Sequence, residues 1–355
     1  MIGMFGKRRP NEAPRKPVRA LILGGGGARG AYEAGVVAAL SEHETFDVVC
    51  GTSIGAINGM FVAQDVPDRL IDVWRTISTR GITQLKPELA TLMLLWQATN
   101  GLMRSPFSQK AAHAVTMMRM LPQLASAARV PSLLGCFEGG KVRSVIRELA
   151  DLSAVKHTFI CGATNLTNGR AEAFAYFPPG HEAAEAAFHA AEWAEPIHAG
   201  NYVDAICASA ALPPVYEPVS ILCKDAVTRS YADGGFTNNA PIRQAIDAGA
   251  TEVTAILADP SGIQNDERSV GSMVDIFATM LDANTVRMLE LDLKLARRIN
   301  EAVLAGRAPD KRYVTIRVIE PRASLRLSAL AFDAQDDVNR LFDLGYEDGQ
   351  AARAA

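Results

Sequence analysis

The chain has 355 residues, of which 48% are hydrophobic, and this is enough to build the core of one large domain. Its formal net charge is −3, so its overall charge does not single out nucleic acid as a partner. No apolar run reaches about 18 residues and no apolar segment follows the basic N-terminal residues, which predicts neither a transmembrane helix nor a secretory signal peptide. The five cysteines lack metal-ligand spacing and are predicted to be reduced and buried, as in a cytoplasmic protein.

Apolar runs and helical periodicities alternate along the chain, and their order predicts an α/β fold. We expect strands at residues 18–24, 47–51, 157–164, 171–176, 252–258 and 312–319. We expect helices at residues 29–41, 54–64, 141–150, 202–211, 240–248 and 284–305. Because strands and helices alternate in the N-terminal half, the sheet should be largely parallel and covered by helices on both faces.

Three further stretches differ from this pattern. The first 19 residues hold six Lys or Arg and one Glu, which predicts a disordered basic tail over residues 1–17 or, alternatively, a segment that docks on an anionic membrane. Residues 178–200 are typical of an insertion, and residues 260–270 of a polar loop. The last 25 residues are acidic and predict a helix.

The segment 85–135 is apolar and rich in methionine. It holds five of the eleven methionines, together with Trp96 and several leucines. One interpretation is a helical subdomain that packs on the sheet. The other is an apolar cap that shapes an acyl pocket and contacts lipid. Both interpretations can hold for the same segment.

Two glycine-rich turns follow the first two expected strands. The first is Gly24–Gly30, with the sequence GGGGARG, and the second is Gly51–Gly55, with the sequence GTSIG. The second has the G-x-S-x-G form, in which a sharp strand-to-helix bend presents a serine hydroxyl, here that of Ser53. The first can offer backbone N–H groups at a helix N-terminus to a developing oxyanion. Together the two turns predict a nucleophile beside an anion site, as acyl transfer requires.

Each turn alone has another interpretation. A G-x-S-x-G string occurs by chance in about one chain in ten of this length and glycine content. The glycine pattern of residues 25–30 also matches the dinucleotide fingerprint, which needs an acidic residue at the end of the second strand. Glu42, Glu44 and Asp47 lie near the required distance, but Asp47 begins that strand. A nucleotide-binding protein that uses this loop remains an alternative.

A serine nucleophile needs a base, and an aspartate is better placed than any histidine. The usual elbow fold has its histidine last in the chain, whereas the last histidine here is His198. Asp233 follows a short strand-like run, Arg229–Ala232, and precedes two glycines, so it can lie on a turn that faces the elbow. An ordinary Asx-turn is the alternative. Asn239 and Pro241 are expected to cap and begin the next helix, which would hold Asp233 on a rigid element.

Three motifs in this order, a glycine-rich loop, G-x-S-x-G and D-G-G, resemble those of the patatin-like phospholipases. The resemblance extends over about residues 18–260. It includes Phe159–Arg170 and Ala208–Pro218, which are similar to the strand and the small-residue helix that precede the aspartate in that family. It implies a three-layer α/β/α fold with a largely parallel sheet and a helical cap. It also implies an acyl hydrolase with a Ser–Asp dyad and no metal or cofactor.

The resemblance implies a role for each motif residue. Ser53 would be the nucleophile and Asp233 its general base. The oxyanion hole would come from the loop residues Gly25, Gly26, Gly27, Ala28, Arg29 and Gly30. Within this loop we expect the amides of Gly26 and Gly27 to point inward and Arg29 to occupy the basic position near the anion site. The remaining motif glycines are Gly51, Gly55, Gly234 and Gly235.

The resemblance also implies a domain plan and a substrate class. The catalytic domain would cover residues 18–320, with the cap at about 85–135, and residues 321–355 would form a C-terminal helical extension. The expected partner is a lipid or phospholipid, with peripheral membrane contact and no nucleic acid, and the expected location is the cytoplasm or the membrane surface. An acyltransferase that uses the same dyad with an alcohol acceptor is an alternative, because none of the motifs separates the two reactions.

Overall fold

A computed structural model of the chain describes residues 16–80, 82, 86, 135, 137, 139–213, 215–258, 273–325, 327 and 331–353. Most of the predicted basic tail, most of the predicted cap over residues 85–135 and the predicted loop at 260–270 lie outside the described residues. Their predictions therefore stay predictions. Within the described part of the chain, no helix is long and apolar enough to cross a membrane.

The strands form one sheet in the order β5-β4-β3-β2-β1-β8-β9, and β7 pairs with both β3 and β6. Their bounds are β1 Arg19–Leu23, β2 Val48–Thr52, β3 Thr158–Asn165, β4 Arg170–Tyr176, β5 Ala194–Pro196, β6 Val219–Leu222, β7 Thr228–Asp233, β8 Glu252–Ile256 and β9 Thr315–Ile319. The five strands from β3 through β2, β1 and β8 to β9 run parallel. The strands β4 and β7 run antiparallel to β3, so the sheet is largely parallel, as predicted.

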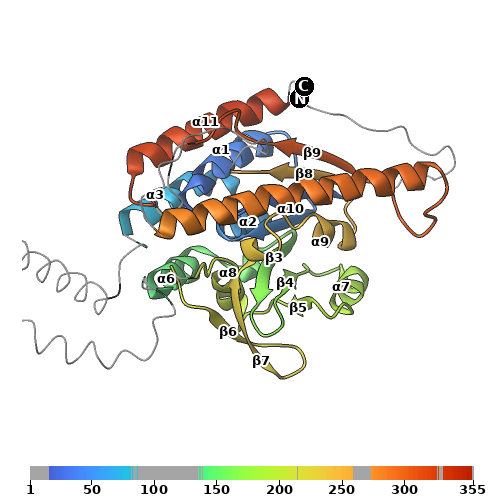
Figure 1. Cartoon of the computed structure of the whole chain (residues 1–355), viewed down its shortest axis with the longest axis horizontal. Helices are drawn as coiled ribbons and strands as arrows, with labels where there is room; N and C mark the ends of the chain where they lie inside the picture. The colour runs from blue at the N-terminus through green and yellow to red at the C-terminus, as the bar shows by residue number, and fades with distance from the viewer. Residues whose placement is uncertain are drawn as a thin grey trace, which may run out of the picture.

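Helices cover both faces of this sheet (Figure 1). One face carries α1 Gly30–Ser41, α2 Ile54–Ala63, α3 Leu70–Arg80, α6 Gly139–Leu149, α8 Tyr202–Ser209 and α11 Gln335–Arg353. The other face carries α7 Glu182–His189, α9 Ile242–Asp247 and α10 Met273–Leu304. The protein is therefore a three-layer α/β/α structure, as the sequence predicts.

Side chains of the central strands alternate between two hydrophobic cores. In β1, Leu21 and Leu23 pack into the core below α1 and α2, whereas Ala20 and Ile22 pack into the core below α9 and α10. Because successive side chains of a strand point to opposite faces, this strand has to be apolar throughout. The same reason explains why its sequence is a continuous apolar run rather than an alternating one.

The expected elements occur near their predicted positions, but the sequence analysis missed several others. All six expected strands and all six expected helices are present, although α10 begins at Met273 and not at residue 284. The helix α3 and the strands β5 and β6 were not predicted. The stretch 178–200, which was expected to be an insertion, holds α7 and the edge strand β5, neither of which was predicted. Residues 335–353 form the predicted C-terminal helix, α11.

Candidate active site

Ser53 lies between the end of β2 and the start of α2, on the turn that the sequence predicts. Its backbone has φ 56° and ψ −125°, an uncommon conformation for a residue other than glycine. The turn tolerates no side chain on either flank. A Cβ on Gly55 would lie 2.3 Å from the Leu23 carbonyl oxygen, and one on Gly51 would lie 2.2 Å from the Gly55 carbonyl oxygen. The G-x-S-x-G spacing thus follows from close backbone packing.

Ser209, at the end of α8, fixes the backbone of Ser53. The Ser53 N–H donates a 3.0 Å hydrogen bond to Ser209 Oγ, and this hydroxyl donates a 2.6 Å hydrogen bond to the Gly162 carbonyl oxygen on β3. Ser209 is fully buried. The sequence analysis did not assign this residue to the site, although it lies in the stretch that resembles the patatin-like family.

Asp233 is the last residue of β7, and β3 holds its backbone. Its N–H donates to the Ala211 carbonyl oxygen at 2.9 Å, and its own carbonyl oxygen accepts from Thr164 Oγ1 at 2.8 Å. The side chain is buried and accepts a 2.8 Å hydrogen bond from the Gly235 N–H, and the Ser53 side chain lies close enough to lower its pKa. The structure therefore brings together the two residues that the sequence analysis selected.

Burial raises the pKa of Asp233 from 3.8 to about 6. The hydrogen bonds from Ser53 and Gly235 stabilise the carboxylate and offset part of this rise. Gly234 and Gly235 follow in a short 3-10 helix, Gly234–Phe236. A Cβ on Gly234 would lie 2.5 Å from the Gly162 carbonyl oxygen, so the turn after the aspartate also needs glycine for close packing.

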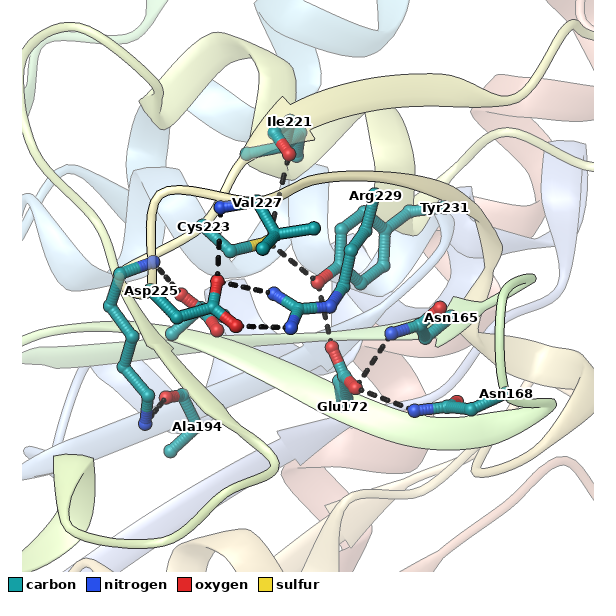
Figure 2. Close-up of polar contacts among 12 residues, drawn as sticks. Asn165, Asn168, Glu172, Ala194, Ile221, Cys223, Asp225, Val227, Arg229 and Tyr231 are labelled. Carbon is teal, nitrogen blue, oxygen red and sulfur yellow. Dashed lines mark hydrogen bonds and ion pairs between the residues drawn. The ribbon is translucent and has the colours of Figure 1, made fainter.

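The base of β7 is held by a buried polar network (Figure 2). Tyr231, two residues before Asp233, donates a 2.7 Å hydrogen bond to Glu172 Oε2 and lies 3.2 Å from Cys223 Sγ. The other oxygen of Glu172 accepts from Asn165 at 2.8 Å and from Asn168 at 3.3 Å. Because β3, β4 and β7 all contribute, the network fixes the strand that carries Asp233.

The glycine loop lies directly against Ser53. A Cβ on Gly25 would lie 3.1 Å from the Ser53 Cβ and 2.4 Å from Asn239 Oδ1. The Gly25 N–H donates to Asn239 Oδ1 at 2.9 Å, and Asn239 Nδ2 donates to the Gly25 carbonyl oxygen at 3.3 Å. The amide of Gly25 is therefore occupied and cannot serve as an oxyanion donor in this arrangement.

The next three amides of the loop are differently placed. Among the residues that the structure describes, the N–H groups of Gly26, Gly27 and Ala28 have no hydrogen-bond partner. Gly27 has φ 58°, which glycine adopts at no steric cost, and it begins the 3-10 helix Gly27–Arg29 that leads into α1 at Gly30. The buried Arg29 side chain donates from Nε to the Gly26 carbonyl oxygen at 3.1 Å.

The expectation that Asn239 caps a helix is wrong. The helix α9 begins at Ile242 with Pro241 as its N-cap, and no side chain caps it. Asn239 instead pairs with Gly25, which lies 214 positions earlier in the chain. A helix-cap signal and a long-range contact use the same amide group, so the local sequence favoured the wrong partner.

The histidines of the described residues make no hydrogen bond with Ser53 or Asp233. His198 accepts at Nδ1 from the Gly200 N–H at 3.1 Å, and burial lowers the pKa of His157. His113 lies outside the described residues. The structure thus gives no support to a Ser–His–Asp arrangement in the part of the chain that it describes.

The acidic residues of the alternative nucleotide-binding interpretation have other partners. Glu44 accepts from the Arg317 guanidinium on β9 at 3.1 and 2.7 Å, and Asp47 accepts from the Arg19 N–H at 2.9 Å. The second strand ends at Thr52, followed by Ser53, without the acidic residue that would bind a ribose.

A cavity of about 320 Å³ opens beside α8. Ala210 and Ala211 line it, and the Ala211 carbonyl oxygen accepts from the Asp233 N–H, so the cavity adjoins the carboxylate's own segment. Its wall carries an ion pair between Arg143 and Asp204, together with the buried thiol of Cys207. The four cysteines of the described residues, Cys50, Cys161, Cys207 and Cys223, are all reduced and buried, as predicted.

The chain also has similarities to known proteins. A stretch of 46 residues is 54% identical to part of the lysophospholipase nte1 of Aspergillus terreus (strain NIH 2624 / FGSC A1156). This match covers 13% of the present chain and 3% of that protein. The structure also matches the solved structure of VipD from Legionella pneumophila, with 13% sequence identity and a TM-score of 0.38. This match covers 99% of the present chain and 69% of the VipD chain. The sequence profile described as Patatin-like phospholipase matches residues 21–246, which include both turns, Ser53 and Asp233. The chain therefore belongs to the patatin-like phospholipase family.

Proposed function

We propose that this protein is a lipid acyl hydrolase, a serine carboxylic-ester hydrolase of the phospholipase A or lysophospholipase type. In this proposal Ser53 is the nucleophile and Asp233 is its general base. The observation that carries the proposal is the place of the Ser53 side chain beside the buried carboxylate of Asp233, whose pKa is about 6. Membership of the patatin-like family supports the choice of a lipid ester as substrate.

The first step is attack on the ester carbonyl. Asp233 accepts the proton of Ser53 as Oγ bonds to the carbonyl carbon. A carboxylate with a pKa of about 6 is a stronger base than an exposed one, and above pH 6 most of it is ionised. Burial thus brings the basicity of Asp233 closer to that needed for proton transfer from a hydroxyl group.

The negative charge that develops on the carbonyl oxygen needs donors that are already in place. We assign this role to the amides of Gly26 and Gly27, since Asn239 occupies the amide of Gly25. Ala28 offers a third amide in the same turn. Each such donor contributes about 3 kcal/mol of transition-state stabilisation.

The reaction then resolves in two steps. Asp233 returns its proton to the leaving alcohol as the carbon–oxygen bond breaks, which leaves an acyl-serine on Ser53. Water attacks this ester, Asp233 takes a proton from the water, and the fatty acid departs as the serine hydroxyl is restored. The dyad is therefore regenerated in each turnover, and the net reaction is ester plus water to acid plus alcohol.

The lipid class rests on the family and on one relative. The matching relative is a lysophospholipase, which favours a phospholipid or lysophospholipid substrate, although the match spans only a small share of that protein. We propose that the enzyme meets this substrate by peripheral contact with a membrane or micelle surface. The cavity beside α8 is a candidate for part of the lipid-binding site, because it adjoins the segment that holds Asp233.

The test is hydrolysis of a short soluble ester and of a long-chain lysophospholipid by the wild type and four variants. We expect Ser53→Ala to abolish hydrolysis and Asp233→Asn to lower kcat by about two to four orders of magnitude, the range of general base catalysis. The controls His157→Ala and His198→Ala should keep most of the activity. Full activity of Ser53→Ala, or loss of activity in a stable histidine variant, would overturn the proposal.

A further inference from the structure

Glu33, in the first turn of α1, is a fully buried carboxylic acid. Its Oε2 accepts a 3.2 Å hydrogen bond from Asn58 Nδ2, whereas its Oε1 is buried and has no hydrogen-bond partner among the described residues. No Lys, Arg or His in the part of the chain that the structure describes forms an ion pair with it. A carboxylate needs donors at both oxygens, whereas a neutral acid carries a proton on one of them.

The unpartnered oxygen of Glu33 faces the glycine loop. A Cβ on Gly24 would lie 3.6 Å from Glu33 Oε1 and 3.4 Å from Asn239 Nδ2, so both side chains lie against the start of the loop. The Gly24 N–H donates to the Ile256 carbonyl oxygen on β8 at 3.2 Å. Glu33 therefore packs against the start of the loop, next to Asn239.

Asn58 connects Glu33 to the other end of the loop. Besides its bond to Glu33, Asn58 Nδ2 donates to the Gly30 carbonyl oxygen at 3.0 Å, and Asn58 Oδ1 accepts from Trp74 Nε1 at 3.0 Å. Both Asn58 and Trp74 are fully buried. The hydrogen bonds that join Trp74, Asn58 and Glu33 thus hold these side chains against the loop at Gly24 and at Gly30.

The surroundings favour the neutral form of Glu33. Burial raises its pKa well above the ordinary value of 4.5, while Asn58 and the nearby Gly24 N–H oppose the rise. The helix α2, which supplies Asn58, has no charged residue. The charged groups of the other elements packed on α1 have other partners. The Arg29 side chain donates to the Gly26 carbonyl oxygen, and Asp348 accepts from Tyr32. On α3, exposed Asp72 and Arg75 pair with each other and exposed Arg80 pairs with Glu148.

We propose that Glu33 is a positioning residue that is kept neutral behind the glycine loop, and that its ionisation sets the alkaline limit of the enzyme. This inference rests on the proposed role of the loop as the oxyanion hole. A neutral acid leaves the field of the loop amides intact, whereas a carboxylate behind them would oppose the negative charge of the oxyanion. A buried carboxylate without a partner would also favour a rearrangement of the loop that lets water solvate the charge.

The first test compares the pH profiles of Glu33→Gln, the neutral isostere, and the wild type. We expect Glu33→Gln to keep kcat/KM within about three-fold of the wild type at pH 7. At alkaline pH, its kcat/KM should either not decline or decline at a higher pH than that of the wild type. The exposed Glu347, on α11, provides the matched control Glu347→Gln, which should keep the wild-type profile. An unchanged alkaline decline in Glu33→Gln, or a loss of ten-fold or more at pH 7, would overturn the proposal.

The second test reads Glu33 without any measurement of activity. Because its folded pKa is raised, the stability contribution of Glu33 is fully present below about pH 4.5 and is lost as the pH rises towards the folded value. The melting temperature of Glu33→Gln should therefore exceed that of the wild type by a margin that widens between pH 5 and pH 9, by about 4 °C or more. A margin that does not change with pH would contradict the inference. If the wild type hydrolyses no ester, the proposed function fails, but this melting series still tests the state of Glu33.

Discussion

Ser53 holds a backbone conformation that costs free energy, and its neighbours keep it there. A non-glycine residue in a sparsely populated region costs about 1–3 kcal/mol. Ser209 Oγ accepts from the strained N–H of Ser53 and donates to Gly162 on the adjacent strand, so it ties the elbow to β3. The Ser53 side chain is thereby held beside the Asp233 carboxylate.

Replacement of Ser209 by alanine tests this support. The change leaves the Ser53 N–H and the Gly162 carbonyl oxygen without their partner in a buried site, which costs about 1–3 kcal/mol of unfolding free energy. We expect kcat on a soluble ester to fall by about ten-fold or more, with a smaller effect on KM. Thr79→Ala, at an exposed position near the end of α3 and outside the cavity beside α8, is the matched control and should change neither quantity. Equal behaviour of the two variants would exclude a role for Ser209.

Asp233 should give the enzyme an acid limb near pH 6. The base acts only when ionised, and burial raises its pKa to about 6, so kcat/KM should fall as the pH drops below that value. Histidine titrates in the same range, and for this reason the profile is also measured in His157→Ala and His198→Ala. The limb should persist in both variants. Its disappearance in either one would assign the titration to that histidine.

The same shift predicts a stability effect of opposite sense to the usual salt-bridged aspartate. The folded pKa of Asp233 is raised from 3.8 to about 6, so its contribution to stability is fully present below about pH 4 and is lost as the pH rises through 6. The difference corresponds to about 3 kcal/mol at most. Asp233→Asn should therefore be more stable than the wild type at pH 8 and close to it at pH 4, by chemical denaturation. A constant difference would contradict the shift.

The proximity of Ser53 and Asp233 could be predicted from sequence, but the contacts that support them could not. Ser53 and Asp233 each stand in a short pattern whose geometry is local: a strand, a glycine turn and a helix. Asn239 pairs with Gly25 across 214 positions, and no local pattern encodes that contact. Glu33 was also missed, because α1 is buried on nearly all sides and its helical pattern does not distinguish an internal acid.

At the scale of elements, the N-terminal helix α1 and the C-terminal helix α11 pack with their backbones in close contact (Figure 1). A Cβ on Gly35 of α1 would lie 1.9 Å from the Phe342 carbonyl oxygen, and one on Gly345 of α11 would lie 2.0 Å from the Tyr32 carbonyl oxygen. Tyr32 also donates a 2.9 Å hydrogen bond to Asp348. The C-terminal helix therefore covers the same helix that begins at the glycine loop.

Gly345→Ala should separate these helices. The added methyl group meets a backbone oxygen that cannot yield without moving α1, and such overpacking costs about 1–3 kcal/mol or more. Gly140→Ala is the matched control, because no atom lies within 4 Å of its added methyl group and alanine favours a helix. Chemical denaturation should give a lower midpoint for Gly345→Ala and an equal or higher one for Gly140→Ala. A neutral Gly345→Ala would contradict the close packing.

Most elements with a clear period were predicted, but the helix α3 and the short edge elements were not. The missed helix α3 does carry a helical pattern, since Leu70, Val73, Trp74 and Ile77 are buried on one face. The strand β5 has only three residues, Ala194–Pro196, and gains its place from pairing with β4. Its sequence is neither β-branched nor alternating. Tertiary pairing, rather than local propensity, decides such a segment.

At the scale of the whole molecule, the order of the strands assembles the site. The parallel strands β1 and β2 end side by side, at the glycine loop and at Ser53. The antiparallel strand β7 pairs with the last residues of β3, beyond the end of β2, and places Asp233 opposite Ala163. Residues from positions 25 to 239 thus meet at one edge of the sheet. This arrangement could be expected for the parallel strands, but the antiparallel approach of β7 was not evident from its sequence.

A lipid substrate predicts a dependence on its physical state. If the segment 85–135 meets lipid with its apolar side chains, hydrolysis of a long-chain phospholipid should increase when the substrate passes from monomers to vesicles. Trp96→Ser should reduce this increase more than it reduces turnover of a short soluble ester, because apolar contact contributes about 25 cal/mol per Å² buried and no chemistry. Equal losses on both substrates would place Trp96 in the protein core.

The central claim, that Ser53 is the nucleophile and Asp233 activates it without histidine, is tested most directly by covalent trapping. The full-length protein is labelled with a lipid-like fluorophosphonate, digested, and the modified residue is identified by mass spectrometry. We predict a single adduct on Ser53, no labelling of Ser53→Ala, labelling of Asp233→Asn that is slower by about two orders of magnitude or more, and wild-type rates in His157→Ala and His198→Ala. An adduct on another serine, or unchanged labelling of Asp233→Asn, would contradict the claim.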